Sequence, residues 1–395
     1  MNSTYAQLIG LRLPMTVLDR VMILSKNFHH LLKEPGFWNA RFKRDFKGLI
    51  HKDIPDYRLY YHLRKEQAGR VVLSDKEMIY HIEGIKAKQV EFWFHEKHGE
   101  PVFLTESGDV YLQLPKPKIS MKWLIDKVSE TETNVIVGPI ITGVYKLLSV
   151  DPENKYRIEC ITEDNRHLKL KIEEGFFAPH KAFRSAERIT IKEKTTGVID
   201  AVWFAADSDI AYLTPDGRVR IDEEFIDLQG IVSIESGSEQ DSVTIIDENG
   251  RVYTCDPDDL KIERVDTGGR PIAKMTITEN WRGIKGGFID LSGRLYTRGD
   301  NRTGALGVPI KKFIKDRWNL VQTPSPILSF SIYNSIGMLF SDIRGVGYGS
   351  GKKRFHFIEG TSKDGFREIP FYSVLSVKYL GLLIVTDRTR PYRWS

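Results

Sequence analysis

One stretch decides the fold, Asp290-Leu-Ser-Gly-Arg-Leu-Tyr-Thr-Arg-Gly-Asp-Asn-Arg-Thr-Gly-Ala-Leu-Gly307. It begins with a tight polar turn around Gly293, continues as a strand that carries Tyr296, and ends in a glycine-rich tail. Hairpin turns need positive φ angles, which glycine and asparagine adopt at little steric cost. The stretch therefore predicts a β-hairpin followed by a sharply turning loop.

The hairpin recurs along the chain after residue 70. Clear copies read Phe103–Tyr111, Ala211–Val219, Thr244–Tyr253 and Gly287–Tyr296, and weaker copies lie at Leu73–Tyr80, Ile161–Leu168, Leu339–Tyr348 and Ile384–Trp394. The turns lie about 45 residues apart on average, within the range of propeller blades. A β-sandwich also has strands at regular spacing, but the last 325 residues are more than one sandwich needs. The repetition favours a six- or seven-bladed β-propeller in a mainly β fold.

Residues 1–70 show the apolar spacing of α-helices instead. Leu18, Val21, Met22, Ser25, Phe28 and Leu32 recur at intervals of three or four, as on one face of a helix, and Pro35-Gly36 predicts its end. A second amphipathic stretch carries Phe37, Trp38, Phe42 and Phe46. We expect a small α-helical domain over residues 1–47, a helical or irregular connector over 48–70, and the propeller over 71–395.

Charge is placed unevenly between these parts. Residues 1–70 contain 13 Lys and Arg against 6 Asp and Glu, whereas the remainder contains 45 against 47. A near-neutral propeller argues against a nucleic-acid-binding body, which needs a clustered basic face. The positive charge of residues 1–70 suits binding to an acidic protein. Alternatively, these Lys and Arg side chains only keep a small helical domain solvated.

Composition indicates an intracellular protein. There is no run of 18 apolar residues and no secretory signal pattern. Cys160 and Cys255 are too few for a disulfide framework or a four-cysteine zinc site.

Motifs of catalysis and metal binding do not occur in the sequence. The alternating glycines of Gly345–Gly351 lack the Gly-Lys-Ser/Thr of a phosphate loop. The acidic run Asp256, Asp258 and Asp259 lacks the glycine and closing glutamate of a calcium loop. We therefore expect no enzyme activity, no cofactor and no metal.

The tail of the opening stretch resembles the repeat of the regulator-of-chromosome-condensation family. Gly299, Asn301, Gly304, Leu306 and Gly307 match that family's Gly-x-Asn-x-x-Gly-x-Leu-Gly, although the family usually has Gln at Ala305 and Trp at Arg298. The resemblance implies a propeller, with these residues and Gly293 in structural roles. The glycines are expected to let the chain reverse as it leaves an inner strand.

The head resembles the second half of an F-box. The matching residues are Leu13, Pro14, Leu18, Leu24, Ser25, Lys26, Phe28, Leu31, Leu32, Pro35, Phe37, Trp38 and Phe42. The family's first Leu-Pro and its helix are shortened here. The resemblance implies that the head binds a Skp-type adaptor of a cullin ubiquitin ligase. The expected adaptor contacts are Leu13, Pro14, Leu18, Val21, Leu24, Phe28, Leu32 and Trp38. The alternative is that these residues form an internal helical core that caps the propeller.

Together the two resemblances predict a substrate-recognition subunit of a Skp–cullin–F-box ubiquitin ligase, whose propeller binds a target protein. The alternative is a propeller scaffold or guanine-nucleotide exchange factor without ligase function. Neither reading involves a membrane or nucleic acid. The expected location is the cytoplasm or the nucleus. An F-box joined to degenerate repeats resembles proteins of large DNA viruses. In that case the protein would be located in the cytoplasm of the host cell.

Overall fold

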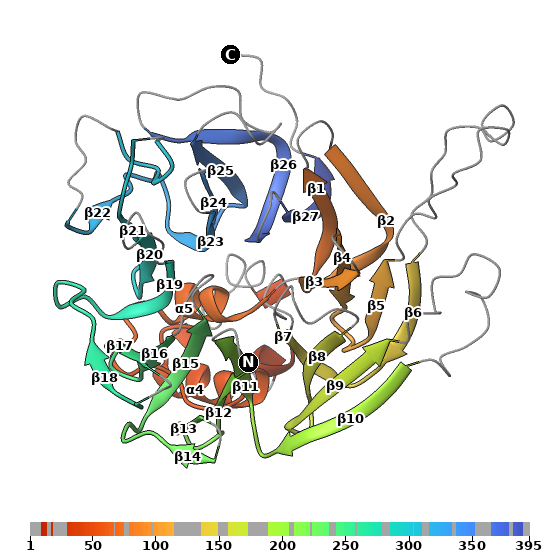
Figure 1. Ribbon diagram of the computed structural model, residues 1–395. Helices are drawn as coiled ribbons and strands as arrows, with labels where there is room; N and C mark the ends of the chain where they lie inside the picture. Colours follow the sequence, from red (N-terminus) through yellow and green to blue (C-terminus); the bar gives the residue numbers. More distant parts are fainter. Residues whose placement is uncertain are drawn as a thin grey trace, which may run out of the picture.

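The computed structural model is a ring of antiparallel β-sheets with two helices packed against it (Figure 1). It describes residues 9–13, 17–18, 30–66, 68–74, 79–95, 98–113, 136–148, 157–172, 189–204, 209–221, 223–236, 242–256, 259–278, 285–302, 304–309, 316–333, 337–351, 365–378 and 382–389. None of the helices in these ranges has the length and apolar character needed to cross a membrane. The predicted fold class, a mainly β propeller preceded by a few helices, is confirmed.

Helix α4 (Pro35–Asp45) lies in the predicted head and α5 (Tyr57–Arg64) in the predicted connector, and residues 9–12, 17–18 and 30–31 are also helical. Most of the helix predicted from Leu18 to Leu32 lies outside the described residues. Pro35 stands in the first turn of α4, where no intrahelical partner is needed for its missing N–H. Pro35-Gly36 thus begins a helix.

Strands β1 to β27 form six sheets among the described residues. Four-stranded sheets are built from β3 (Gln89–His95), β4 (His98–Leu104), β5 (Val110–Gln113) and β6 (Ile136–Ile141); from β7 (Val144–Leu148), β8 (Arg157–Thr162), β9 (Arg166–Ile172) and β10 (Ile189–Thr196); from β11 (Asp200–Phe204), β12 (Asp209–Leu213), β13 (Val219–Ile221) and β14 (Glu224–Phe225); from β15 (Ile231–Ser236), β16 (Val243–Asp247), β17 (Val252–Cys255) and β18 (Ile262–Arg264); and from β19 (Ile272–Thr278), β20 (Lys285–Asp290), β21 (Leu295–Arg298) and β22 (Asn319–Leu320). The seven-stranded sheet contains β23 (Ile327–Tyr333), β24 (Gly337–Asp342), β25 (Val346–Gly351), β26 (Arg367–Lys378), β27 (Leu382–Thr389), β1 (Gly69–Ser74) and β2 (Ile79–Ala87).

The seven-stranded sheet closes the ring. Its first part, β23 to β25, pairs with β26, and β26 in turn pairs with β27. Strand β1 then pairs with β27, so strands from the two ends of the chain lie side by side (Figure 1). The propeller has six blades when each continuous sheet counts as one. The largest blade contains two four-stranded groups that share β26.

Six hairpin turns share one construction, at residues 105–109, 162–166, 214–218, 247–251, 290–294 and 342–346. The first residue is Thr or Asp, and its side-chain oxygen accepts a hydrogen bond from the N–H of the fifth residue. The donors are Asp109 (3.1 Å), Arg166 (3.0 Å), Arg218 (3.2 Å), Arg251 (2.8 Å), Arg294 (3.0 Å) and Val346 (2.8 Å). The fourth residue has a positive φ, from 64° at Asn165 to 82° at Gly108. The hairpins predicted around these turns are confirmed.

Each turn also bonds to the next four-stranded group. The carbonyl of its fourth residue accepts a hydrogen bond from an N–H at or just before the start of the following first strand, or, in the last case, from within β26. These bonds join Val144 to Gly108 (2.9 Å), Val198 to Asn165 (3.1 Å), Ile231 to Gly217 (2.9 Å), Ile272 to Gly250 (2.9 Å), Ile327 to Gly293 (2.7 Å) and Val374 to Gly345 (2.8 Å). The repeated turn is therefore both a hairpin and a joint between neighbours.

Candidate protein-interaction sites

The head packs onto the ring through an aromatic core. Trp38 and Tyr61 are fully buried, with ring centroids 6.0 Å apart, and Phe42 stacks on Tyr61 at 6.1 Å. This core is continuous with apolar side chains of the last two sheets, among them Leu306 and Met338. Burying each such side chain contributes roughly 1.5–3 kcal/mol. The head and the ring are therefore one packed unit.

Arg41 ties the start of the head to α4. It is 1% exposed, and its guanidinium donates to the carbonyls of Gly10 (2.9 Å) and Leu13 (2.9 Å). Asp45 lies 3.5 Å from the same guanidinium and accepts a hydrogen bond from the Tyr61 hydroxyl at 2.6 Å. Burial and this bond to Asp45 raise the pKa of Tyr61 to about 12. The buried cation thus joins the helical residues at 9–12 to α4.

The structure turns most described members of the predicted adaptor surface inward. Leu18 and Trp38 are fully buried, and Leu13 and Leu32 are partly buried against the same core. The indole N–H of Trp38 donates to the carbonyl of Leu32 at 2.8 Å. This arrangement favours the internal-core alternative for Leu18 and Trp38. The remaining four, Pro14, Val21, Leu24 and Phe28, lie outside the described residues.

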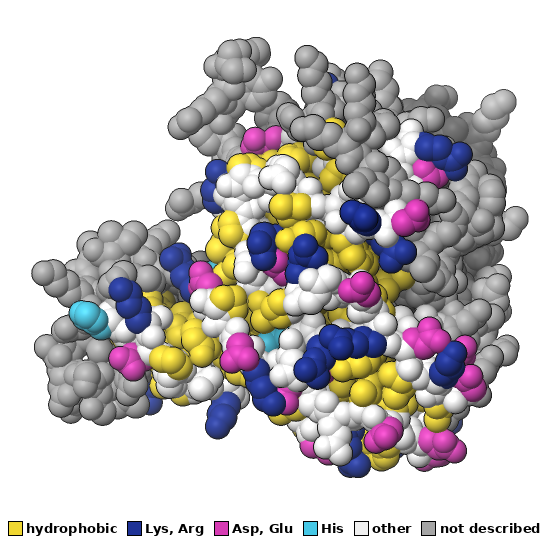
Figure 2. Space-filling model, turned by 90° about the vertical axis from the view of Figure 1, so that its left-hand side faces the viewer, with side chains coloured by type: hydrophobic (Ala, Val, Ile, Leu, Met, Phe, Trp, Pro, Cys, Tyr) yellow, Lys and Arg dark blue, Asp and Glu magenta, His cyan; other side chains and the backbone are white. Residues whose placement is uncertain are grey.

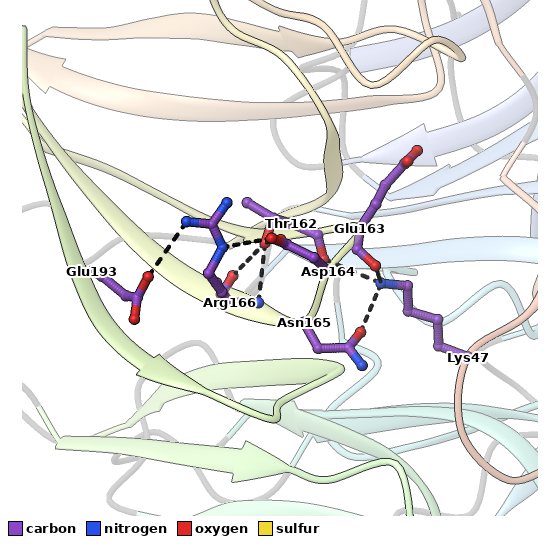
Figure 3. A network of polar contacts seen from close by, with 7 residues as sticks. All are labelled: Lys47, Thr162, Glu163, Asp164, Asn165, Arg166 and Glu193. Atoms are coloured by element: carbon purple, nitrogen blue, oxygen red, sulfur yellow. Dashed lines mark hydrogen bonds and ion pairs between the residues drawn. The ribbon is translucent and has the colours of Figure 1, made fainter.

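The connector after α4 fastens the head to the hairpin turns. The ammonium of Lys47 donates to the carbonyls of Thr162 (3.1 Å) and Glu163 and to the side-chain oxygen of Asn165 (2.7 Å), as Figure 3 shows. Burial lowers the pKa of Lys47, against the opposing effect of the Glu163 and Asp164 carboxylates. Lys47 thereby clamps the turn at residues 162–166.

Three further contacts continue this attachment around the ring. Lys52 bonds to the turn at 247–251: its backbone N–H donates to the Glu248 carbonyl, and its ammonium lies 2.5 Å from the Glu248 carboxylate. Arg64 donates to the Val232 carbonyl of β15 at 3.3 Å. Lys65 lies 3.9 Å from Glu106 in the turn at 105–109. The connector therefore crosses the ring on the face that carries the turns.

A groove of about 390 Å³ lies where the connector meets β17, β18 and the loop into β19. Its basic lining residues are Lys52, Arg251, Arg264 and Arg270. Asp53 also lines it, and Asp266 lines a smaller hollow that shares Arg264. Apolar lining comes from Val252, Val265 and Leu291. The groove thus combines several basic side chains with a few apolar ones.

The repeat-signature residues have structural roles. Asn301 is 1% exposed; its amide donates to the Val308 carbonyl (2.9 Å), and its oxygen accepts from the Leu306 N–H (2.9 Å). Gly293, Gly299, Gly304 and Gly307 all have positive φ. The expectation that the loop follows an inner strand is wrong. It follows β21, the third strand of its sheet, and packs against the next sheet, where Ser350 donates to the Ala305 carbonyl at 3.0 Å.

The titratable groups of the described residues do not form a metal centre. No group of three or more His, Cys, Asp or Glu side chains in these residues could hold a metal ion. Burial raises the pKa of the Cys160 thiol to about 12 and that of Cys255 to about 11, so both stay protonated at neutral pH. His167 is buried between Glu159 (2.8 Å) and the Tyr212 hydroxyl (3.2 Å), where it links β8, β9 and β12.

Sequence reasoning missed Arg41, Lys47, Lys52 and the groove. A lysine or arginine in a basic head is indistinguishable from a solvated one unless its partner is known. One signal was readable: the Thr or Asp that begins each of the six turns recurs at the same place in the hairpin copies.

Comparison with known proteins supports the fold. No protein-family model and no curated protein sequence matches the chain. Among solved structures, yeast RCC1 (Prp20) bound to Kap60 matches with a TM-score of 0.51 and 11% identity, over 85% of this chain and 92% of that one. Human WBSCR16 matches with a TM-score of 0.46 and 11% identity, over 81% and 98% of the two chains. The chain thus has a propeller fold resembling that of RCC1.

Proposed function

We propose that the chain is a non-enzymatic bridging protein, whose head binds one protein and whose propeller binds another. The observation that carries the proposal is the continuous core beneath α4, α5 and the last two sheets. A shared core holds two binding surfaces in a fixed geometry, as a bridge requires. Yeast RCC1 (Prp20), which has a similar fold, is bound to another protein, Kap60, in its solved structure, and this supports a protein partner.

The head offers an apolar surface for the first partner. Ile9 is 42% exposed and Val17 is 39% exposed. Among the residues that the structure describes, these are two of four large apolar side chains that remain exposed, with Ile191 and Phe225. Since removing apolar surface from water drives association, Ile9 and Val17 are the contacts that we propose.

We further propose that the first partner is a Skp-type adaptor, which makes the chain a substrate receptor of a cullin ubiquitin ligase in the cytoplasm or nucleus. The F-box resemblance of the head supports this identification. Because Leu18 and Trp38 are buried, the contact would run through Ile9 and Val17 and not through the core residues.

Co-purification with a recombinant Skp-type adaptor tests the proposal. We expect a stable complex with the wild-type chain, its loss in Val17→Glu, and its retention in Ile191→Glu. The control places the same charge on an exposed apolar side chain of β10, outside the head. Failure of the wild-type chain to bind the adaptor would exclude the ligase function. A photo-crosslinker at position 17 that gives no more protein adducts than one at position 191 would exclude the head as a binding surface altogether.

The exchange-factor alternative shares the propeller fold and makes a different prediction. An exchange factor accelerates release of labelled nucleotide from a small GTPase, whereas the bridging protein leaves that rate unchanged.

A further inference from the structure

Arg251 differs from the arginines at the equivalent position of three other turns. Arg166, Arg218 and Arg294 each pair with an aspartate of their own turn: Asp164 at 2.7 Å, Asp216 at 2.9 Å and Asp290 at 2.8 Å. In the turn at 247–251, Asp247 and Glu248 are the nearby acids. The structure records no side-chain partner for Arg251 among the described residues.

The two acids of this turn bond to groups other than the Arg251 side chain. The Lys52 ammonium holds the Glu248 carboxylate at 2.5 Å, and the backbone N–H of Lys52 donates to the Glu248 carbonyl. The free carboxylate oxygen of Asp247 accepts from Asn249 at 3.5 Å and from the Tyr253 hydroxyl at 3.4 Å. Glu248 is thus held by Lys52 and Asp247 by Asn249 and Tyr253 of its own sheet, and the Arg251 side chain pairs with neither.

A second guanidinium faces the same groove. Arg264, at the end of β18, is exposed and also has no side-chain partner among the described residues. Arg270 is committed elsewhere: it donates to the Thr267 carbonyl at 3.0 Å and lies 4.7 Å from the centre of the Tyr296 ring. The groove therefore presents two guanidinium groups that no side chain of the described residues pairs with, beside the apolar residues of its lining.

We propose that this groove binds an acidic peptide segment of the protein that the propeller recognises. Guanidinium groups bind carboxylates through paired hydrogen bonds, and Val252, Val265 and Leu291 provide apolar contact between them. The inference rests on the proposed function, in that it names the chemistry of the propeller's partner. Figure 2 views the ring from the side where β17, β18 and β22 lie in Figure 1, and it shows Lys and Arg side chains, with Asp and Glu among them, next to hydrophobic surface.

The observations favour a peptide over a nucleic acid. Nucleic-acid affinity comes from many phosphate contacts along a basic face. This groove has two unpaired cations, carries Asp53 in its lining, and has Asp266 in the adjoining hollow. A short run of Asp or Glu needs only two such cations, whereas a nucleic acid depends on many phosphate contacts that this groove does not offer.

Fluorescence anisotropy with labelled hexaglutamate tests the inference in the full chain. We expect saturable binding that weakens with added salt, and affinity about tenfold lower in Arg251→Glu and in Arg264→Glu. The matched control is Arg218→Glu, the same position in a neighbouring turn, which should bind like the wild type. Hexaglutamine should not bind, and a labelled six-residue thymidine oligonucleotide should bind more weakly than hexaglutamate.

Each other outcome overturns the inference. It fails if hexaglutamate does not bind the wild type, if Arg218→Glu weakens binding as much as Arg251→Glu, or if the oligonucleotide binds as tightly as the peptide. The Val17→Glu variant separates the two proposals, because it should lose the adaptor and retain hexaglutamate. If the wild type binds the adaptor but not hexaglutamate, only the peptide-binding proposal is excluded. If it binds hexaglutamate but not the adaptor, only the ligase proposal is excluded.

Discussion

Gly250 is a position where the joint between neighbouring sheets leaves no room for a side chain. Its φ is 73°, and a Cβ added there would lie 2.6 Å from the Ile272 nitrogen and 2.7 Å from the Pro271 Cα. Gly269 has the same φ of 73°, but a Cβ added there meets nothing within 4 Å. Comparing Gly250→Ala with Gly269→Ala therefore separates the backbone clash from the cost of the left-handed conformation.

The magnitudes follow from the contacts. The left-handed conformation costs an alanine roughly 1–2 kcal/mol, and both variants bear this cost. At Gly250 the new methyl lies well inside the usual contact distance of about 3.5 Å, so Pro271 and Ile272 must move. Overpacking of this kind costs about 1–3 kcal/mol, and a weakened Ile272-to-Gly250 hydrogen bond adds about 1 kcal/mol. Gly250→Ala should therefore lose about 2–4 kcal/mol more than Gly269→Ala.

Urea denaturation followed by tryptophan fluorescence measures this difference. We expect a clearly lower midpoint for Gly250→Ala and a small shift for Gly269→Ala. Asn165 shows that the turn itself accepts a Cβ, and there the residue before Val198 is Gly197 instead of a proline. Equal midpoints for the two variants would refute the idea that close packing between sheets fixes Gly250.

The remaining predictions concern three other contacts. Lys47→Met leaves three oxygen acceptors without their donor and should lower the free energy of unfolding by about 1–3 kcal/mol. Lys43→Met, on the exposed face of α4, should have little effect. Equal shifts of the melting temperature in the two variants would contradict the clamp. Asn301→Ala removes two buried hydrogen bonds and should cost about 2–3 kcal/mol in urea denaturation, against less than about 1 kcal/mol for the exposed Arg302→Ala. Burial lowers the pKa of His51 to about 3, whereas the unfolded value is about 6.5. Between these two pH values the unfolded chain binds a proton that the folded chain does not. The free energy of unfolding therefore falls as the pH drops from about 6.5 toward 3. His51→Gln should reduce that pH dependence by about one proton between pH 6 and 4, and an unchanged slope would show that the folded ring protonates freely.

The sequence by itself determined the local backbone. The turns at Gly217, Gly250 and Gly293 were predicted because a positive φ is a property of the residue and its immediate neighbours. Their repetition at blade-like intervals indicated a ring, since each hairpin needs a neighbour to cover it. The helical spacing before residue 70 and the alternating strands after it were readable for the same reason.

Only the tertiary structure decided which surfaces remain free. The inward packing of Leu18 and Trp38 depends on the last two sheets, which lie far along the chain. The pairing of β1 with β27 likewise joins segments whose own patterns do not name a partner. Arg251 is the sharpest case. It occupies the same turn position as Arg218 and Arg294, which pair with an aspartate of their own turn, whereas Glu248 beside Arg251 is held by the distant Lys52. Whether a charged side chain is paired depends on contacts between residues that are far apart in the sequence. Periodicity along the chain does not predict such contacts.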